Sequence, residues 1–119
     1  METTIDSGTD KEADMAIEVR DNPDEARFEI YAQGVRAGLV DYTISGDRIT
    51  LTHTETSPEF AGRGLAKQLI TFALDQARER RLQVLPICPY ALRVITENQD
   101  AYLHLVPADA RAQFELPDR

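Results

Sequence analysis

Apolar and polar residues alternate through the first half of the chain with the two-residue period of β-strands. Residues 26–34 are the clearest case, because Phe28, Ile30 and Ala32 point to one side and polar residues to the other. Short turns rich in glycine, proline, aspartate and asparagine separate the strand candidates, and such connections favour an antiparallel meander. The predicted strands are residues 15–20, 26–34, 35–44 and 48–56.

The pattern changes to a helical period after Ser57 and Pro58. Between residues 64 and 81, apolar side chains recur at three- and four-residue spacings, which predicts one amphipathic helix. The apolar residues of its inner face are Leu65, Ala66, Leu69, Ile70, Ala73 and Ala77. Arginines cluster at the end of this segment, where cations oppose the negative pole of the helix dipole.

Further elements follow this helix. Residues 82–88 form an apolar run that predicts a buried strand, residues 90–99 predict a weaker helix, and residues 101–106 fit either type. If strand 82–88 lies parallel to strand 48–56, the helix between them is a crossover connection. The predicted fold class is therefore α+β, with an antiparallel β-meander followed by α-β-α and helices packed on a mixed sheet.

Composition narrows the function classes. The chain of 119 residues fits one small domain, and its net charge of −8 argues against sequence-independent binding to nucleic acid. A single cysteine, Cys88, cannot form an internal disulfide and favours a reducing compartment. No apolar run is long enough to span a membrane, and the first residues lack the features of a secretory signal, so we expect a cytoplasmic protein.

The ends of the chain are expected to lie outside the packed domain. Residues 1–14 are acidic and polar with almost nothing to bury, which predicts a disordered lead. The predicted domain then runs over residues 15–113, and residues 114–119 are expected to form a frayed tail.

The segment AGRGLA at 61–66 has the physical requirements of a pyrophosphate site. It places glycines directly before the predicted helix, where backbone N–H groups lack intrahelical partners and carry partial positive charge. Gly62 and Gly64 remove the side chains that would keep a ligand from the backbone, and Arg63 and Lys67 add charge within one turn. Glycine pairs before helices also serve as simple turns, so the motif alone leaves both interpretations open.

Two blocks of sequence resemble a known family. The segment PEFAGRGLAKQL resembles the acetyl-CoA-binding motif Arg/Gln-x-x-Gly-x-Gly/Ala of the GNAT acyltransferase superfamily. Gly64 and Ala66 match its last two fixed positions, and Gly62 matches a frequent extra glycine. Ala61 stands where the superfamily usually has arginine or glutamine.

The chain resembles one compact branch of the superfamily more closely. Proteins of this branch consist of little more than one N-acetyltransferase domain. Its hallmarks resemble the blocks LTHTETSPEFAGRGLA (51–66) and LPICPYALRVITENQDAYLHLV (85–106). The likeness extends over about residues 16–106, with Asn98 and Gln99 where branch members often carry His-Pro.

The resemblance implies a GNAT-like fold in which two parallel strands splay apart and hold acetyl-CoA between them. Backbone groups at the end of strand 48–56 would pair with the pantetheine arm, and the glycine turn would bind the pyrophosphate. The implied cofactor-binding residues are Glu55, Thr56, Gly62, Arg63, Gly64, Leu65, Ala66 and Lys67.

Acetyl transfer to an amine requires a base for the amine and an acid for the leaving thiolate. Cys88 precedes Pro89 at a predicted helix start, where a thiol can serve as acyl acceptor or acid, although most free cysteines are small buried residues. His53 is predicted to share a strand face with Ile49, Leu51 and Glu55. His53 is a candidate base or orienting residue and Glu55 a candidate amine ligand or base, while a hydrogen-bonded histidine and a solvated carboxylate are the structural alternatives.

Two tyrosines are candidates for protonating the leaving thiolate. Tyr102 lies in the region where many superfamily members place such a tyrosine, and Tyr90 follows the Cys88-Pro89 pair. For both rings, packing is the favoured explanation. The spacing of the histidines and the cysteine is unlike that of zinc ligands, so no metal is expected.

Two functions remain open from the sequence. The first is an acetyl-CoA-dependent N-acetyltransferase that acts on an unidentified amine, either a small molecule or a protein. The alternative is a non-catalytic CoA- or acyl-CoA-binding module that regulates a partner, because the short chain lacks the helices that usually build a substrate wall. A purely structural acidic partner explains neither sequence block.

Overall fold

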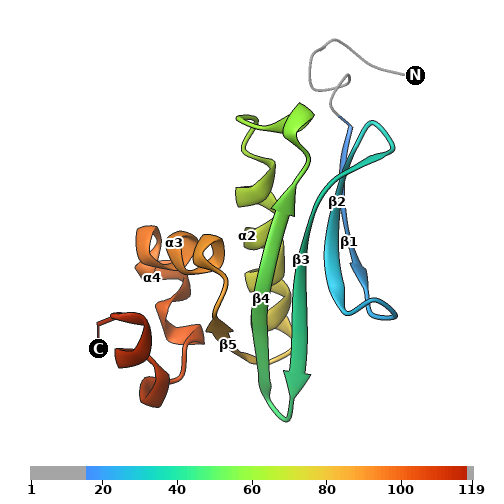
Figure 1. Ribbon diagram of the computed structural model, residues 1–119. Helices are drawn as coiled ribbons and strands as arrows, with labels where there is room; N and C mark the ends of the chain where they lie inside the picture. The colour runs from blue at the N-terminus through green and yellow to red at the C-terminus, as the bar shows by residue number, and fades with distance from the viewer. Residues whose placement is uncertain (1–15, 118–119) are drawn as a thin grey trace, which may run out of the picture.

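The computed structural model describes residues 16–117 as a mixed sheet with helices packed against it (Figure 1). The strands are β1 (Ile17–Asn22), β2 (Arg27–Ala32), β3 (Val35–Ser45), β4 (Arg48–Thr56) and β5 (Gln83–Pro86). The helices are α2 (Leu65–Glu79), α3 (Pro89–Glu97) and α4 (Gln99–Tyr102), with a short 3₁₀ turn η2 (Pro58–Phe60) before α2. The predicted lead at 1–14 lies outside the described residues.

The strands follow one another in the order β1-β2-β3-β4-β5. The first four are antiparallel, β5 is parallel to β4, and α2 connects this parallel pair. The predicted α+β fold, a meander followed by α-β-α, is confirmed. The predicted strand at 82–88 is longer than the observed one, because only the four residues of β5 pair with β4.

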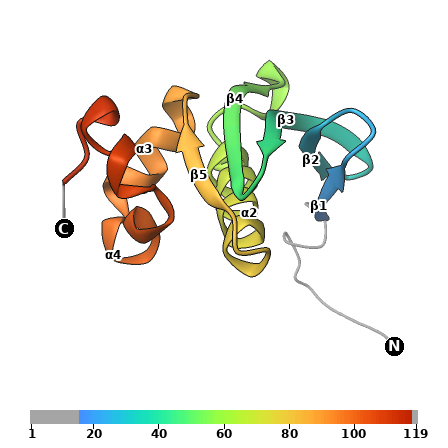
Figure 2. The same cartoon turned by 90° about the horizontal axis from the view of Figure 1, so that it is seen from below.

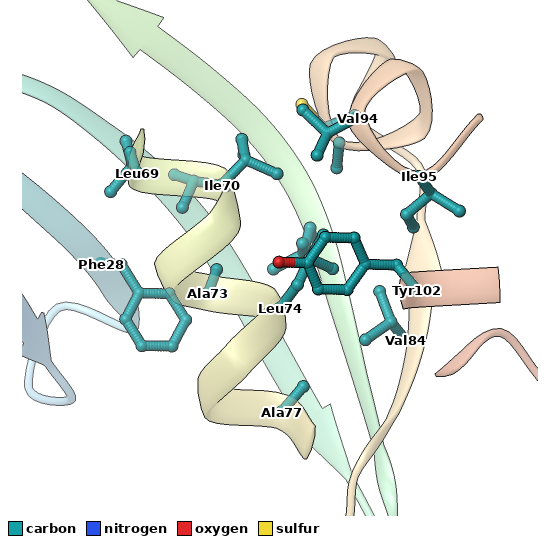
Figure 3. Packing of buried hydrophobic residues seen from close by; sticks show 14 of the residues in the cluster. Phe28, Leu69, Ile70, Ala73, Leu74, Ala77, Val84, Val94, Ile95 and Tyr102 are labelled. Atoms are coloured by element: carbon teal, nitrogen blue, oxygen red, sulfur yellow. The ribbon is translucent and has the colours of Figure 1, made fainter. Parts of the chain in front are cut away.

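Helix α2 covers one face of the sheet, and its apolar side packs into the core that strands and helices share (Figure 3). Phe28 of β2 faces this helix, with its ring 5.7 Å from that of Phe72. Leu69, Ile70 and Leu74 of α2 are fully buried, and burying each such side chain contributes about 2 kcal/mol. The opposite face of β1–β4 is covered by no α-helix of residues 16–117 and is called the open face below (Figure 2).

The segment after β5 forms two helices where the sequence predicted one. At Asn98 the backbone leaves the helical region, with φ −137°, while its side-chain amide donates to the Val94 carbonyl at 2.8 Å and closes α3. The ambiguous run at 101–106 continues as the end of α4 and a 3₁₀ turn, η3 (Leu103–Leu105). Packing extends past residue 113, the predicted end of the domain, since Leu116 is buried.

A β-bulge in β4 changes which side chains share a face. The register pairs Asp41 with His53 and Tyr42 with Leu51, so Thr52 is an extra residue in β4. Because an extra residue shifts the alternation by one, Leu51 is buried in the core while His53 is exposed on the other face. The prediction that His53 shares a face with the apolar residues before it is therefore wrong.

Candidate active site

The two parallel strands separate at the point where their pairing ends. Pairing stops at Leu51 and Pro86, and the last link is the Cys88 N–H donating to the Leu51 carbonyl at 2.8 Å. Beyond it β4 continues to Thr56, whereas the other chain segment turns away into α3 (Figure 1). Since successive peptide groups of a strand point to alternate sides, residues 52–56 present backbone donors and acceptors to an edge that no strand of residues 16–117 covers.

The open edge of β4 leads through η2 into the glycine turn. Gly62 and Gly64 both have left-handed backbones, with φ 80° and 74°. Gly64 caps α2 without a side-chain hydrogen bond, and the first turn of α2 contains no acidic residue. The helix start therefore keeps backbone N–H groups and positive potential that no carboxylate of its own first turn neutralises.

A cavity lies directly at this turn and extends to the end of β4. Its lining residues are Thr56, Phe60, Ala61, Gly62, Gly64, Leu65, Ala66 and Tyr90. Most residues predicted from the glycine motif line this cavity. Arg63 and Lys67 flank the turn with exposed side chains, and the Arg63 guanidinium lies 5.7 Å from the centre of the Phe60 ring. The arrangement fits an anionic group such as a pyrophosphate.

Tyr90 also lines this cavity, although the sequence suggested it only as a candidate acid for the leaving thiolate. Its ring is 43 % exposed, and it comes from the first turn of α3, on the far side of the separation from β4. A ring with this exposure is not a core residue, and as a lining residue it is open to contact with a ligand at the glycine turn. Its place in the cavity depends on how α3 lies beside α2, which the local sequence does not determine.

Thr54 and Cys88 meet where β4 and β5 separate. The Thr54 hydroxyl and the Cys88 Sγ are 2.7 Å apart, and Cys88 is 1 % exposed. Cys88 is also the N-cap residue of α3, with Pro89 at the first helical position, as the sequence predicted. Thr54 pairs with buried Val40, so this contact lies on the α2 side of the sheet.

His53 and Glu55 form a second pair on the opposite face. His53 Nε2 lies 2.8 Å from Glu55 Oε2, and both side chains are more than half exposed. A histidine hydrogen-bonded to a carboxylate has the orientation of its ring fixed. The pair is thus suited to remove a proton from an amine that approaches this face.

The four residues therefore do not form one cluster. The backbone of β4 separates His53 and Glu55 on the open face from Thr54 and Cys88 on the α2 side. A reactive thiolate needs a neighbour such as a histidine, but His53 is not the residue that contacts the Cys88 thiol. The residue that contacts this thiol is Thr54, which was not among the candidates predicted from the sequence.

Tyr102 lies apart from both pairs. Its hydroxyl contacts Asp75 Oδ1 at 3.2 Å, and its ring is buried against α2 (Figure 3). Asp75 is about 15 Å along α2 from the glycine turn at a rise of 1.5 Å per residue. Burial, followed by the charge and hydrogen bond of Asp75, raises the pKa of Tyr102. Packing of α4 on α2 accounts for this tyrosine.

Two other features bear on the class of site. Among residues 16–117, no group of histidine, cysteine and carboxylate side chains has the arrangement of a metal site. In the same part of the chain, no helix has the length and apolar character needed to cross a membrane.

The family of the chain follows from comparison with known proteins. A model of the family described as GCN5-related N-acetyl-transferase matches residues 27–105. Protein NATD1 of Xenopus tropicalis is 31% identical over 85 residues, which span 70% of this chain and 78% of that protein. The solution structure of a GCN5-like candidate N-acetyltransferase from Staphylococcus aureus superposes with a TM-score of 0.57 at 25% identity, over 76% of this chain and 87% of that one.

The chain therefore belongs to the GCN5-related N-acetyltransferase family, as the two sequence blocks predicted. Membership of this family supports an acetyltransferase function.

Proposed function

We propose that the protein is an acetyl-CoA-dependent N-acetyltransferase. The observation that carries the proposal is the continuity between the uncovered edge of β4 and the glycine turn that starts α2. Backbone groups of Glu55 and Thr56 would pair with an extended arm, and the N–H groups from Gly62 to Lys67 would bind a pyrophosphate. When bound, acetyl-CoA supplies an acetyl thioester, which is reactive toward amines.

His53 and Glu55 act on the acceptor in this proposal. An ammonium group must lose a proton before its nitrogen can attack, and His53 Nε2 is exposed on the face that an acceptor can reach. Glu55 orients the imidazole, so its effect operates through His53. The proton then passes from the imidazolium to solvent, because the pair lies at the surface.

We propose that the acetyl group moves directly to the amine rather than through Cys88. The thiol is buried and shares its hydrogen bond with a neutral hydroxyl, and buried cysteines without a charged partner are unreactive. As a neutral thiol at the junction of β4 and β5, it would instead give a proton to the leaving sulfur when the acyl arm lies between these strands.

Calorimetry with acetyl-CoA, CoA and ATP, followed by a turnover assay on a panel of amines, tests the proposal. We expect binding of both CoA compounds at micromolar concentration and amine-dependent release of free CoA thiol. His53→Gln should lower kcat by about 10²-fold, the usual contribution of a general base. His104→Gln is the matched control, since His104 is exposed and far along the chain in η3.

Two results would contradict this function. No heat from CoA or acetyl-CoA at millimolar concentration would exclude the cofactor site. Tight CoA binding without acetylation of any amine would instead favour the alternative, a non-catalytic CoA-binding module.

A further inference from the structure

A second cavity adjoins the first on the open face of the sheet. Its lining residues are Arg36, Gly38, Leu39, Glu55, Thr56, Ser57 and Pro58. Thr56 belongs to the lining of both cavities, so the two meet at the end of β4. One cavity is lined mainly by residues of the glycine turn and the start of α2, and the other carries opposite charges on Arg36 and Glu55. Group transfer requires two substrates in adjoining sites, and this pair of cavities has that arrangement.

We propose that the second cavity binds a small acceptor that carries both an amine and an anionic group, such as an amino acid. This inference rests on the proposed acetyltransferase function, because it names the class of acceptor. The amine end would lie at Glu55 and His53, and the anionic end at Arg36.

The strand register places the charges on either side of one apolar residue. Glu29 of β2 pairs with Leu39 of β3, and Leu39 pairs with Glu55 of β4. Directly paired residues point to the same face, and two strand separations of about 4.8 Å put the backbones of Glu29 and Glu55 about 10 Å apart. The Arg36 guanidinium lies at Glu29, 3.5 Å from its carboxylate, so Leu39 forms a floor between Arg36 and Glu55.

A buried carboxylate holds the positive side of the cavity in place. Glu29 is 4 % exposed, and it accepts hydrogen bonds from Arg27 at 2.7 Å, Tyr31 at 2.9 Å and Asn22 at 3.2 Å. One carboxylate thus faces two guanidiniums, those of Arg27 and Arg36. Arg27 also faces Asp41, its partner in β3, and is mostly covered, whereas Arg36 remains 45 % exposed, so the charge of Arg36 is available to the cavity. An anionic group on the acceptor would balance it.

The size of the cavity limits the acceptor. Its volume is about 190 Å³, below the roughly 300 Å³ at which sites for drug-sized ligands begin. Ser57 and Pro58 belong to its lining, and Glu55, also a lining residue, contacts His53. These dimensions fit a single small zwitterion better than a folded protein surface.

Pairs of compounds that differ only in the anionic group test this inference. We would titrate 4-aminobutanoate and butylamine into ¹⁵N-labelled protein without any CoA compound and follow the resonances of Leu39 and the Arg36 side chain. We expect 4-aminobutanoate to bind at least about tenfold more tightly, equivalent to about 1.4 kcal/mol. The same preference should hold in kcat/KM for acetylation.

Substitutions then assign the preference to one side chain. Arg36→Gln should remove the difference between the two compounds and leave butylamine unaffected, and Arg36→Lys should restore part of it. Arg20→Gln is the matched control, because Arg20 lies on the same face, is half exposed, and pairs with Glu18 outside the cavity. Equal binding of the two compounds, or a preference that survives in Arg36→Gln, would overturn the inference.

The outcomes separate this inference from the proposed function. Acetylation of amines with no preference for the anionic group would refute the zwitterion site and leave the acetyltransferase function intact. Arg36-dependent binding of 4-aminobutanoate by a protein that binds no CoA would support the site and refute the function.

Discussion

The Thr54 hydroxyl lies 2.7 Å from the Cys88 sulfur, at the junction where β4 and β5 separate. This contact joins the two strands immediately beyond their last paired residues, Leu51 and Pro86. It also satisfies the thiol with a neutral partner on the α2 side, while His53 and Glu55 occupy the other face. Because the partner of Cys88 at this junction is neutral, the contact favours direct transfer of the acetyl group to the amine over an acyl-cysteine intermediate.

Removal of the thiol distinguishes direct transfer from an acyl-cysteine intermediate. We expect Cys88→Ala to lower kcat by less than about tenfold, because loss of an assisting acid costs far less than loss of a nucleophile. Mass spectrometry of wild-type protein after incubation with acetyl-CoA should show no acetyl group on the peptide that contains Cys88. An acetylated Cys88, together with a loss of about 10³-fold or more in Cys88→Ala, would establish the covalent route instead. Thr54→Val controls for disruption of the junction.

A substitution in the glycine turn should weaken CoA binding in addition to destabilising the fold through backbone strain. Gly64 has φ 74°, and an added Cβ would meet no atom within 4 Å. Gly46, in the β3–β4 turn, has φ 61° and equally open surroundings. Alanine at either position should therefore destabilise the fold by about 1 kcal/mol through left-handed strain. Only Gly64→Ala should weaken CoA binding, by about tenfold, because its methyl group hinders approach to the helix start.

Chemical denaturation and calorimetry on the two glycine variants check this prediction. Equal loss of stability with unequal loss of CoA affinity is the expected pattern. If Gly46→Ala weakens CoA binding as much as Gly64→Ala does, the glycine turn has no direct role in binding.

Tyr102 should contribute to stability and not to chemistry. Its hydroxyl contacts Asp75, which also accepts a hydrogen bond from Arg78 at 2.7 Å. Tyr102→Phe should lower the free energy of unfolding by about 1 kcal/mol, the usual contribution of one hydrogen bond, and leave kcat unchanged. A tenfold fall in kcat with unchanged stability would return Tyr102 to the role of acid that its sequence position suggested.

Alkaline stability should depend on Tyr42. Burial, followed by the hydrogen bond to Asp21 at 2.7 Å, raises the pKa of Tyr42 from 10.0 to about 12. The folded state therefore keeps the phenol proton after the unfolded chain has lost it. Its contribution to stability is complete below pH 10 and is lost as the pH rises from 10 to 12, by an amount on the order of 2 kcal/mol.

Urea unfolding at several alkaline pH values tests this dependence. Tyr42→Phe should be less stable than wild type at pH 8 and should lose less stability between pH 10 and 12. Tyr90→Phe serves as the control and should follow the wild-type curve, since Tyr90 is 43 % exposed whereas Tyr42 is buried. Parallel wild-type and Tyr42→Phe curves over that interval would refute the prediction.

Local periodicity determined most of the fold. The two-residue alternation in β2 and the helical spacing of apolar residues in α2 each reflect burial of one face of a regular element, so the elements and their order were predictable. The glycine turn could also be found, because left-handed backbone at Gly62 and Gly64 is a local requirement. The family likewise followed from two sequence blocks.

Tertiary structure alone decided how the candidate catalytic residues divide between the two faces of β4. A single extra residue, Thr52, reverses the alternation before His53, and a bulge leaves no mark in a local pattern of apolar and polar residues. The contact of Thr54 with Cys88, and the approach of Arg36 to Glu29, join residues that lie far apart or on different strands. Such contacts depend on strand register, which packing of the whole sheet against α2 determines.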